Sequence, residues 1–347
     1  MTNSTVLIQR YPDGLCAITA AGTPDVLTAA PGPDTMVLQV LGGHLVWNVL
    51  AGQEIPAALL DDTDSAQEWV WAIYGEPAAL ALDAVATGGE SAEATAFAAR
   101  PALAASAYRL AYAHWASRWW PASTLDGIAA LDQDLLDLDI AQLTEECEAL
   151  LDGADALAPP VSATAESSLR ASDYALAAGD EHRSGALVLA RGTDGWDWRR
   201  CPPGLVDASE SAVSWELVRD AGATTVAISV AAHPERSADA PAHLRPWARV
   251  DTGRGEVDTE LRPVHDTWIG ESPLSAPASA IRIAIHVPGF GPLPDTASPL
   301  ESAADLRARI RDFAAARLHS AAIPEIDGDP LAPLLAEIAA AAGDSDF

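Results

Sequence analysis

The sequence predicts a mixed α+β protein, with a small N-terminal β-meander, a central helical region and a C-terminal antiparallel β-sandwich followed by helices. Three observations support this fold class. Short β-rich runs separated by turn residues come first, apolar residues then recur every three or four positions, and later they alternate at every second position. Since 347 residues exceed one typical domain, we divide the chain into residues 1–60, 61–182, 183–295 and 296–347.

The N-terminal region contains the short runs TVLIQR, GLCAITA, TMVLQV and HLVWNVL. Between the first two stands Tyr-Pro-Asp-Gly at residues 11–14. Proline fixes φ, the Asp side chain accepts a local backbone hydrogen bond and glycine tolerates positive φ, so this tetrapeptide predicts a turn. The region is therefore predicted to be a small antiparallel sheet or meander.

The helical period begins at about residue 61. Tyr108, Tyr112, Trp115 and Trp119 follow one another at spacings of four, three and four, which places them on one helix face, and Pro121 ends that helix. A second amphipathic helix has an apolar stripe and acidic residues over most of its remaining surface; the stripe consists of Leu136, Ile140, Leu143, Cys147 and Leu150. Residues 153–168 are predicted to be a linker, and residues 168–179 a short helix.

The C-terminal half changes to a period of two. Val226, Ile228 and Val230 alternate with small polar residues, and residues 281–287 alternate in the same way, which predicts strands with one buried face. About six such strands with turn signals between them are typical of a β-sandwich. Ser298-Pro299 then starts a helix with an apolar stripe at Leu306, Ile310 and Phe313.

The charge restricts the partners. Fifty acidic residues stand against 20 basic ones, giving a formal net charge of −30 and a pI near 4.3. Such a chain repels phosphate backbones and anionic lipid, so we expect no direct nucleic-acid or membrane partner, whereas a protein with a basic surface is compatible with it. All 20 basic residues are Arg, which excludes a Schiff-base lysine and a P-loop on this lysine-free chain.

The compartment predicted is the cytoplasm of a bacterium with a GC-rich genome, since such genomes favour Ala, Gly, Pro and Arg. No secretory signal or membrane-spanning apolar run is visible in the sequence. Cys16, Cys147 and Cys201 are widely spaced and odd in number, which fits reduced thiols better than a disulfide framework.

Two sets of residues are weak candidates for chemistry. The stretch DGWDWRRCPPG places Cys201 after Arg199 and Arg200, whose charge would favour a thiolate nucleophile. Four histidines and a carboxylate in the predicted sandwich have side chains that bind divalent metals, although their spacing is long and irregular; these are His233, His243, His265, His286 and Asp266. With Cys201, His265 and Asp266 are also the weak catalytic candidates. No cofactor motif occurs, so we expect none.

Aromatic side chains give the better binding candidates, because aromatic residues are enriched in the cores of protein interfaces. Trp120 and Trp196 stand in segments punctuated by proline or glycine, and we expect them to be exposed anchors. Trp198, Arg199 and Arg200 complete the predicted binding set, and His286 is expected to be accessible on the polar face of its strand.

Together these features favour a non-catalytic protein-binding, scaffold or regulatory subunit of a larger bacterial multiprotein system, with an accessory role in conflict or defence as one form of it. The alternative is a hydrolase or metal-dependent enzyme that uses the histidine-rich C-terminal β domain or Cys201.

Overall fold

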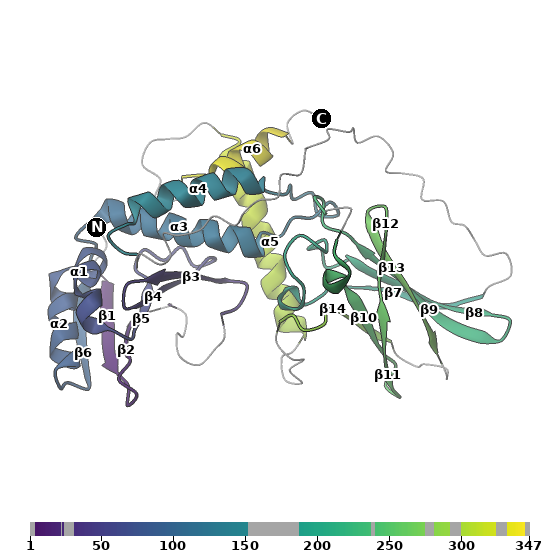
Figure 1. Ribbon diagram of the computed structural model, residues 1–347, viewed down its shortest axis with the longest axis horizontal. Coiled ribbons are helices and arrows are strands. Elements are labelled where there is room, and N and C mark those ends of the chain that lie inside the picture. The colour runs from purple at the N-terminus through teal and green to yellow at the C-terminus, as the bar shows by residue number, and fades with distance from the viewer. Residues whose placement is uncertain are drawn as a thin grey trace. The chain divides into compact units, whose positions relative to one another are not determined.

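The computed structural model describes residues 4–21, 23, 31–151, 187–236, 240–274, 281–291, 300–323 and 332–343 (Figure 1). The predicted linker at 153–168 and the predicted helix at 168–179 lie outside these residues. The chain forms two compact units. The first consists of Met1–Ala122, Ile128–Ala158 and Pro299–Phe347, and the second of Ser123–Gly127 and Pro159–Ser298. The predicted α+β class is confirmed: antiparallel sheets at both ends of the sequence are separated by helices and followed by helices.

In the described residues, the sheet of the first unit has six strands in the order β3-β4-β5-β2-β1-β6, all paired antiparallel. Their bounds are Ser4–Arg10 (β1), Cys16–Ala20 (β2), Thr35–Val40 (β3), Gly43–Asn48 (β4), Ala57–Leu60 (β5) and Ser91–Ala96 (β6). The predicted turn at residues 11–14 joins β1 to β2. Gly14 has a φ of +92°, and the Leu15 amide donates to the Asp13 carboxylate.

Strand β6 departs from the prediction, because it lies in the part expected to be helical. Its residues Ser-Ala-Glu-Ala-Thr-Ala include good helix formers. In the structure they pair antiparallel with the outer side of β1, from Ser4 opposite Ala96 to Gln9 opposite Ser91. Strand pairing thus outweighs local helix propensity at this position.

The helices of the first unit are α1 (Thr63–Tyr74), α2 (Glu76–Ala86), α3 (Pro101–Trp119), α4 (Gln133–Glu146), α5 (Leu300–Ala321) and α6 (Leu335–Gly343). The predicted aromatic face of α3 is confirmed for three of its four residues, and the fourth, Trp119, is half-buried. Tyr108, Tyr112 and Trp115 are buried. The rings of Tyr112 and Trp115 stack 5.6 Å apart, and both meet Phe313 of α5 edge to face.

A buried polar cluster joins α3, α5 and α6. Glu337 on α6 is fully buried, and its carboxylate accepts two hydrogen bonds from Arg317 on α5, of 2.9 and 2.6 Å. The Tyr112 hydroxyl donates to the same carboxylate at 2.7 Å, and the Leu334 amide donates at 2.8 Å. Burial, followed by the nearby charge of Glu337, raises the pKa of Tyr112 well above its usual range, which keeps this donor protonated.

The second unit contains two antiparallel sheets in its described residues (Figure 1). One has the order β12-β13-β9-β8-β7, and the other β11-β10-β14. Their bounds are Leu187–Asp194 (β7), Val213–Asp220 (β8), Ala223–Ala231 (β9), Trp247–Asp251 (β10), Glu256–Glu260 (β11), Arg262–Val264 (β12), Thr267–Leu274 (β13) and Arg282–His286 (β14).

The period-two pattern predicted for this unit is confirmed. Val226, Ile228 and Val230 of β9 are buried, and so are Ile283 and Ile285 of β14. The intervening residues of β9 are half-buried and form the outer face of the larger sheet. Across the part of the chain that is described, no helix is both long enough and apolar enough to cross a membrane.

Candidate functional site

The tryptophans of the DGWDWRRCPPG stretch anchor it to the protein interior. Trp196 and Trp198 are only 8% and 6% exposed. The Trp196 indole donates to the backbone carbonyl of Asp207 at 2.7 Å. The expectation that Trp196 is an exposed anchor is therefore wrong, because its N–H is used to hold a neighbouring loop. Trp120, in the first unit, is half-buried and donates to the Ala129 carbonyl.

The two arginines of this stretch have different surroundings. Arg199 forms two hydrogen bonds with Asp197, which also caps the short helix Trp198–Arg200. The backbone carbonyl of Arg200 accepts from the Val287 amide at 2.9 Å, so this segment runs along the end of β14. Gly291 allows the close approach: its φ is +77°, and a Cβ there would come within 2.1 Å of the Arg199 carbonyl.

Cys201 is buried, with 2% of its surface exposed. Burial raises its pKa to about 12, and the nearby Arg200 charge, which lowers the pKa, does not offset this effect. A thiol in this state is almost entirely protonated at neutral pH and out of contact with solvent. The geometry therefore gives little support to Cys201 as a nucleophile.

The predicted histidines occupy different parts of the second unit. His243 is exposed in the short helix Ala242–Leu244, and His265 is exposed with a φ of +50° in the turn between β12 and β13. His233 is half-buried, and its Nδ1 accepts from the Glu235 amide. Within the described residues, no three His, Cys, Asp or Glu side chains are grouped as metal ligands. The sequence candidates are thus not brought together as a site.

His286 differs from its expected accessibility, since it is 8% exposed. The Val287 amide, next to His286, donates to the Arg200 carbonyl, so the segment around Arg200 lies beside the end of β14. Burial, followed by the charge of Arg200, lowers the pKa of His286, so the neutral ring is favoured. Its Nδ1 has no hydrogen-bond partner among the described residues.

Asp207 organises the loop that follows the tryptophans. It is fully buried, and its carboxylate accepts from the Ser123 hydroxyl at 2.7 Å, the Thr124 amide at 2.8 Å and the Ser209 amide at 2.9 Å. The Ser209 hydroxyl in turn donates to Asp126. These contacts tie the segment Ser123–Gly127 into the second unit. Sequence reasoning missed them because the partners are 84 residues apart.

The Ser123 hydroxyl and the Asp207 carboxylate are both closed off from solvent. Ser123 is 1% exposed, and its hydroxyl donates to a carboxylate that two backbone amides already hold. A substrate would have to displace the surrounding chain to reach the Ser123 oxygen. The arrangement satisfies a buried charge and orders two loops.

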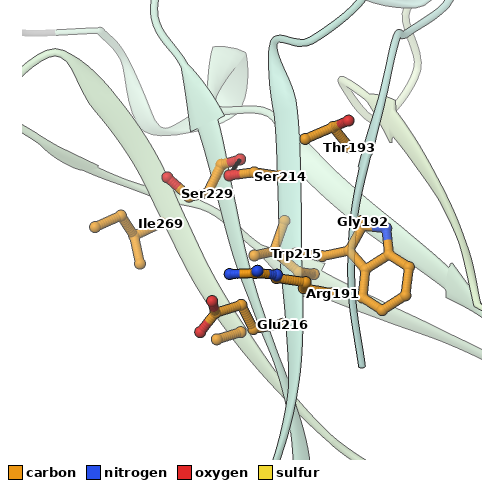
Figure 2. Close-up of a pocket in the computed structure, with 10 residues that line it drawn as sticks. Arg191, Gly192, Thr193, Ser214, Trp215, Glu216, Ser229 and Ile269 are labelled. Atoms are coloured by element: carbon orange, nitrogen blue, oxygen red, sulfur yellow. Dashed lines mark hydrogen bonds between the residues drawn. The ribbon is translucent and has the colours of Figure 1, made fainter. Parts of the chain in front are cut away.

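An open depression of about 450 Å³ lies on the outer face of the five-stranded sheet (Figure 2). Ser214 lies opposite Ser229, and Arg191 lies opposite Glu216, so these side chains share one face. Figure 2 shows the two serines together, with Arg191 and Glu216 beside them. The other side chains lining it include Thr193 and Ile269. The surface therefore combines hydroxyl groups, one charge of each sign and an apolar side chain, without a concentrated reactive group.

Strand β7 borders this depression and ends the sheet. Among the described strands it pairs with β8 alone. Its first residues are apolar and exposed: Leu187 by 61%, Val188 by 50% and Leu189 by 40%. The pairing is irregular between Val188 and Ala190, which leaves Leu189 without a partner on β8. The Trp215 ring lies against Gly192, where a Cβ would approach it to 2.7 Å.

No protein-family model matches the sequence, and neither a curated protein nor a solved structure matches it.

Proposed function

We propose that this chain is a non-catalytic protein-binding subunit that holds an extended segment of a partner along β7 and over the adjoining depression. The observation that carries the proposal is the exposed apolar start of an edge strand next to an open, polar sheet face. We place this role in a larger bacterial assembly in the cytoplasm, with a conflict or defence accessory as one form of it.

Edge strands support this proposal through their backbone. A strand with only one neighbour presents N–H and C=O groups that a partner strand can pair with. The exposed side chains of Leu187, Val188 and Leu189 add an apolar contribution to such pairing. The irregular pairing at Leu189 is a β-bulge position, and bulges limit uncontrolled edge association while they redirect side chains. We therefore expect a specific partner rather than aggregation.

The side chains that line the depression would let the protein select among partner segments. Ser214, Ser229 and Thr193 offer short hydroxyl groups that donate or accept hydrogen bonds, and Ile269 offers an apolar contact. Arg191 and Glu216 permit recognition of either charge. The net charge of −30 favours a partner that is basic overall.

The enzyme alternative receives less support from the geometry. Cys201 and Ser123 are buried, and burial raises the pKa of the Cys201 thiol to about 12. The open depression lacks the His, Cys or paired carboxylates that a hydrolase would place there.

The test is affinity purification from the native host at moderate salt, with mass spectrometry of the recovered proteins. We compare the natural chain with Val188→Lys/Leu189→Lys, since lysines on an edge strand oppose strand addition. The expected result is a stoichiometric partner whose recovery falls about tenfold or more in this variant. Because both positions are exposed, the free energy of unfolding should change by less than about 0.5 kcal/mol.

The matched control is Trp71→Lys/Leu80→Lys, which adds the same charge at two exposed apolar positions of α1 and α2. It should retain the partner. Recovery of the natural chain alone would contradict the proposal, as would equal partner recovery with the β7 variant.

A further inference from the structure

The last helix of the described chain presents an apolar stripe to solvent. On α6, the exposed residues Leu335, Ile338, Ala339 and Ala342 follow the spacing i, i+3, i+4 and i+7, which places them on one helix face. Leu335 and Ile338 are 46% and 42% exposed. The one polar residue of this helix, Glu337, points inward to Arg317. The stripe therefore lacks polar side chains of its own.

The neighbouring helix supplies an acidic border. Helix α4 packs against α6, and the Asp139 carboxylate accepts from the Ala336 amide at 3.4 Å. Next to Asp139, Leu138 is 58% exposed. The spacing of Asp134, Leu138 and Glu145 places them on one exposed face of α4. Neither helix contains a basic residue.

We propose that the α6 stripe and the exposed face of α4 form a docking surface for a basic amphipathic helix of a partner protein. Such a helix would lay its apolar side on Leu335, Ile338 and Leu138, and its Lys or Arg residues would face the carboxylates of α4. Apolar contact at the centre with complementary charge at the border is the pattern of a stable helix interface.

Charge distinguishes this occupant from two others. A second copy of the chain would bring two acidic α4 helices together, and each copy carries a net charge of −30. An anionic membrane surface would be repelled by the same carboxylates. A basic helix is the occupant that the charges attract.

The surface goes beyond the β7 site proposed above, because it lies on the first unit and uses none of the same residues. A chain with two separate docking surfaces would connect two proteins, which is the role of a scaffold.

The probe is a fluorescein-labelled peptide of roughly 18 residues, built from Leu and Lys with Leu at helical spacing, and a second peptide of the same composition with the Leu residues scattered. Fluorescence polarisation measures both against the full chain at low and moderate salt. The patterned peptide should bind about tenfold more tightly than the scattered one, because only the patterned one presents a continuous apolar face.

The decisive variant is Leu335→Gln/Ile338→Gln, which keeps helix propensity while removing the apolar contact. It should abolish the difference between the two peptides, while Trp71→Gln/Leu80→Gln should preserve it. Circular dichroism should show the same helix content for all three proteins.

Three results would overturn the inference. The peptides would bind equally to the natural chain if attraction were purely electrostatic. If the α6 stripe were not the binding site, Leu335→Gln/Ile338→Gln and Trp71→Gln/Leu80→Gln would show the same difference in affinity between the two peptides. Sedimentation equilibrium would reveal a dimer lost in Leu335→Gln/Ile338→Gln if the stripe joined two copies. The β7 variant Val188→Lys/Leu189→Lys should still bind the patterned peptide, so failure at either surface is distinguishable from failure at the other.

Discussion

Each unit of this protein buries a carboxylate completely, and the two units stabilise it differently. In the first, Glu337 is paired with a charged Arg317 and a tyrosine hydroxyl. In the second, Asp207 is held by neutral donors: one serine hydroxyl and two backbone amides. A carboxylate removed from water thus obtains its partners from a counter-charge between helices in the first unit, and from neutral hydrogen-bond donors between loops in the second.

The largest loss of unfolding free energy is expected when the ion pair between Arg317 and Glu337 is broken. Arg317→Ala leaves Glu337 buried without its cation, and we expect a loss of about 3–5 kcal/mol in unfolding free energy. Denaturant titration followed by circular dichroism measures this loss. The double variant Arg317→Met/Glu337→Leu should recover part of it, since it removes both charges but leaves the Tyr112 hydroxyl and the Leu334 amide without their acceptor. A single variant as stable as the natural chain would contradict the assigned role of the pair.

A smaller loss of unfolding free energy is expected when the buried Asp207 of the second unit is replaced. Asp207→Ala leaves the Ser123 hydroxyl and two amides without their acceptor, which should cost about 1–3 kcal/mol. Asp207→Asn keeps one acceptor oxygen and should cost less.

The two losses can be assigned to their units by thiol labelling with peptide mapping. Cys147 reports on the first unit and Cys201 on the second, because both are buried and burial raises the pKa of each to about 12. Arg317→Ala should expose Cys147 at lower denaturant, and Asp207→Ala should expose Cys201. If both thiols react together in both variants, the two units unfold as one, and the comparison between them fails.

The smallest loss of unfolding free energy is expected when an ion pair on the surface of the second unit is broken. Arg249 forms two hydrogen bonds with Asp258, at 2.8 and 2.9 Å, and these bonds lower the pKa of that carboxyl. Both side chains are partly exposed, so Arg249→Gln should cost about 0.2–1 kcal/mol.

The pH dependence of this contribution has a definite sign. A carboxyl whose pKa is lowered on folding stabilises the protein above its unfolded pKa, about 3.9, and this stabilisation declines as the pH falls through the lowered folded pKa. The difference in unfolding free energy between Arg249→Gln and the natural chain should shrink over that acidic window. An unchanged difference there would contradict the assignment.

Local chemistry made much of the fold predictable. The Tyr-Pro-Asp-Gly turn, the aromatic face of α3 and the alternating strands depend on neighbours in the sequence, and each was predicted from them. Strand β6 was not, because its pairing with β1 is a tertiary contact that overrides the preferences of Ala and Glu. Asp139 looked like one more solvated acid on α4 but is 5% exposed, since α6 arrives from the far end of the chain to cover it.

The candidate sites were less predictable than the fold. Trp196 stands in a loop sequence that resembles an exposed anchor, and only the position of the Asp207 carbonyl shows that its indole is satisfied inside. The β7 edge is visible only once the strand order is known, since the sequence does not tell which strand lacks a second neighbour.

The membership of Ser123–Gly127 in the second unit has a consequence for synthesis on the ribosome. Ser123 emerges 84 residues before Asp207, which at ordinary elongation rates is a delay of roughly 4 to 17 s. Throughout that interval the segment has no Asp207 carboxylate to bind, and the helices α5 and α6 that complete the first unit are still to be synthesised. Dividing the gene at any single point between Ser123 and Asp207 would make the delay permanent, because the C-terminal fragment would contain Asp207 without the serine that completes its hydrogen bonds.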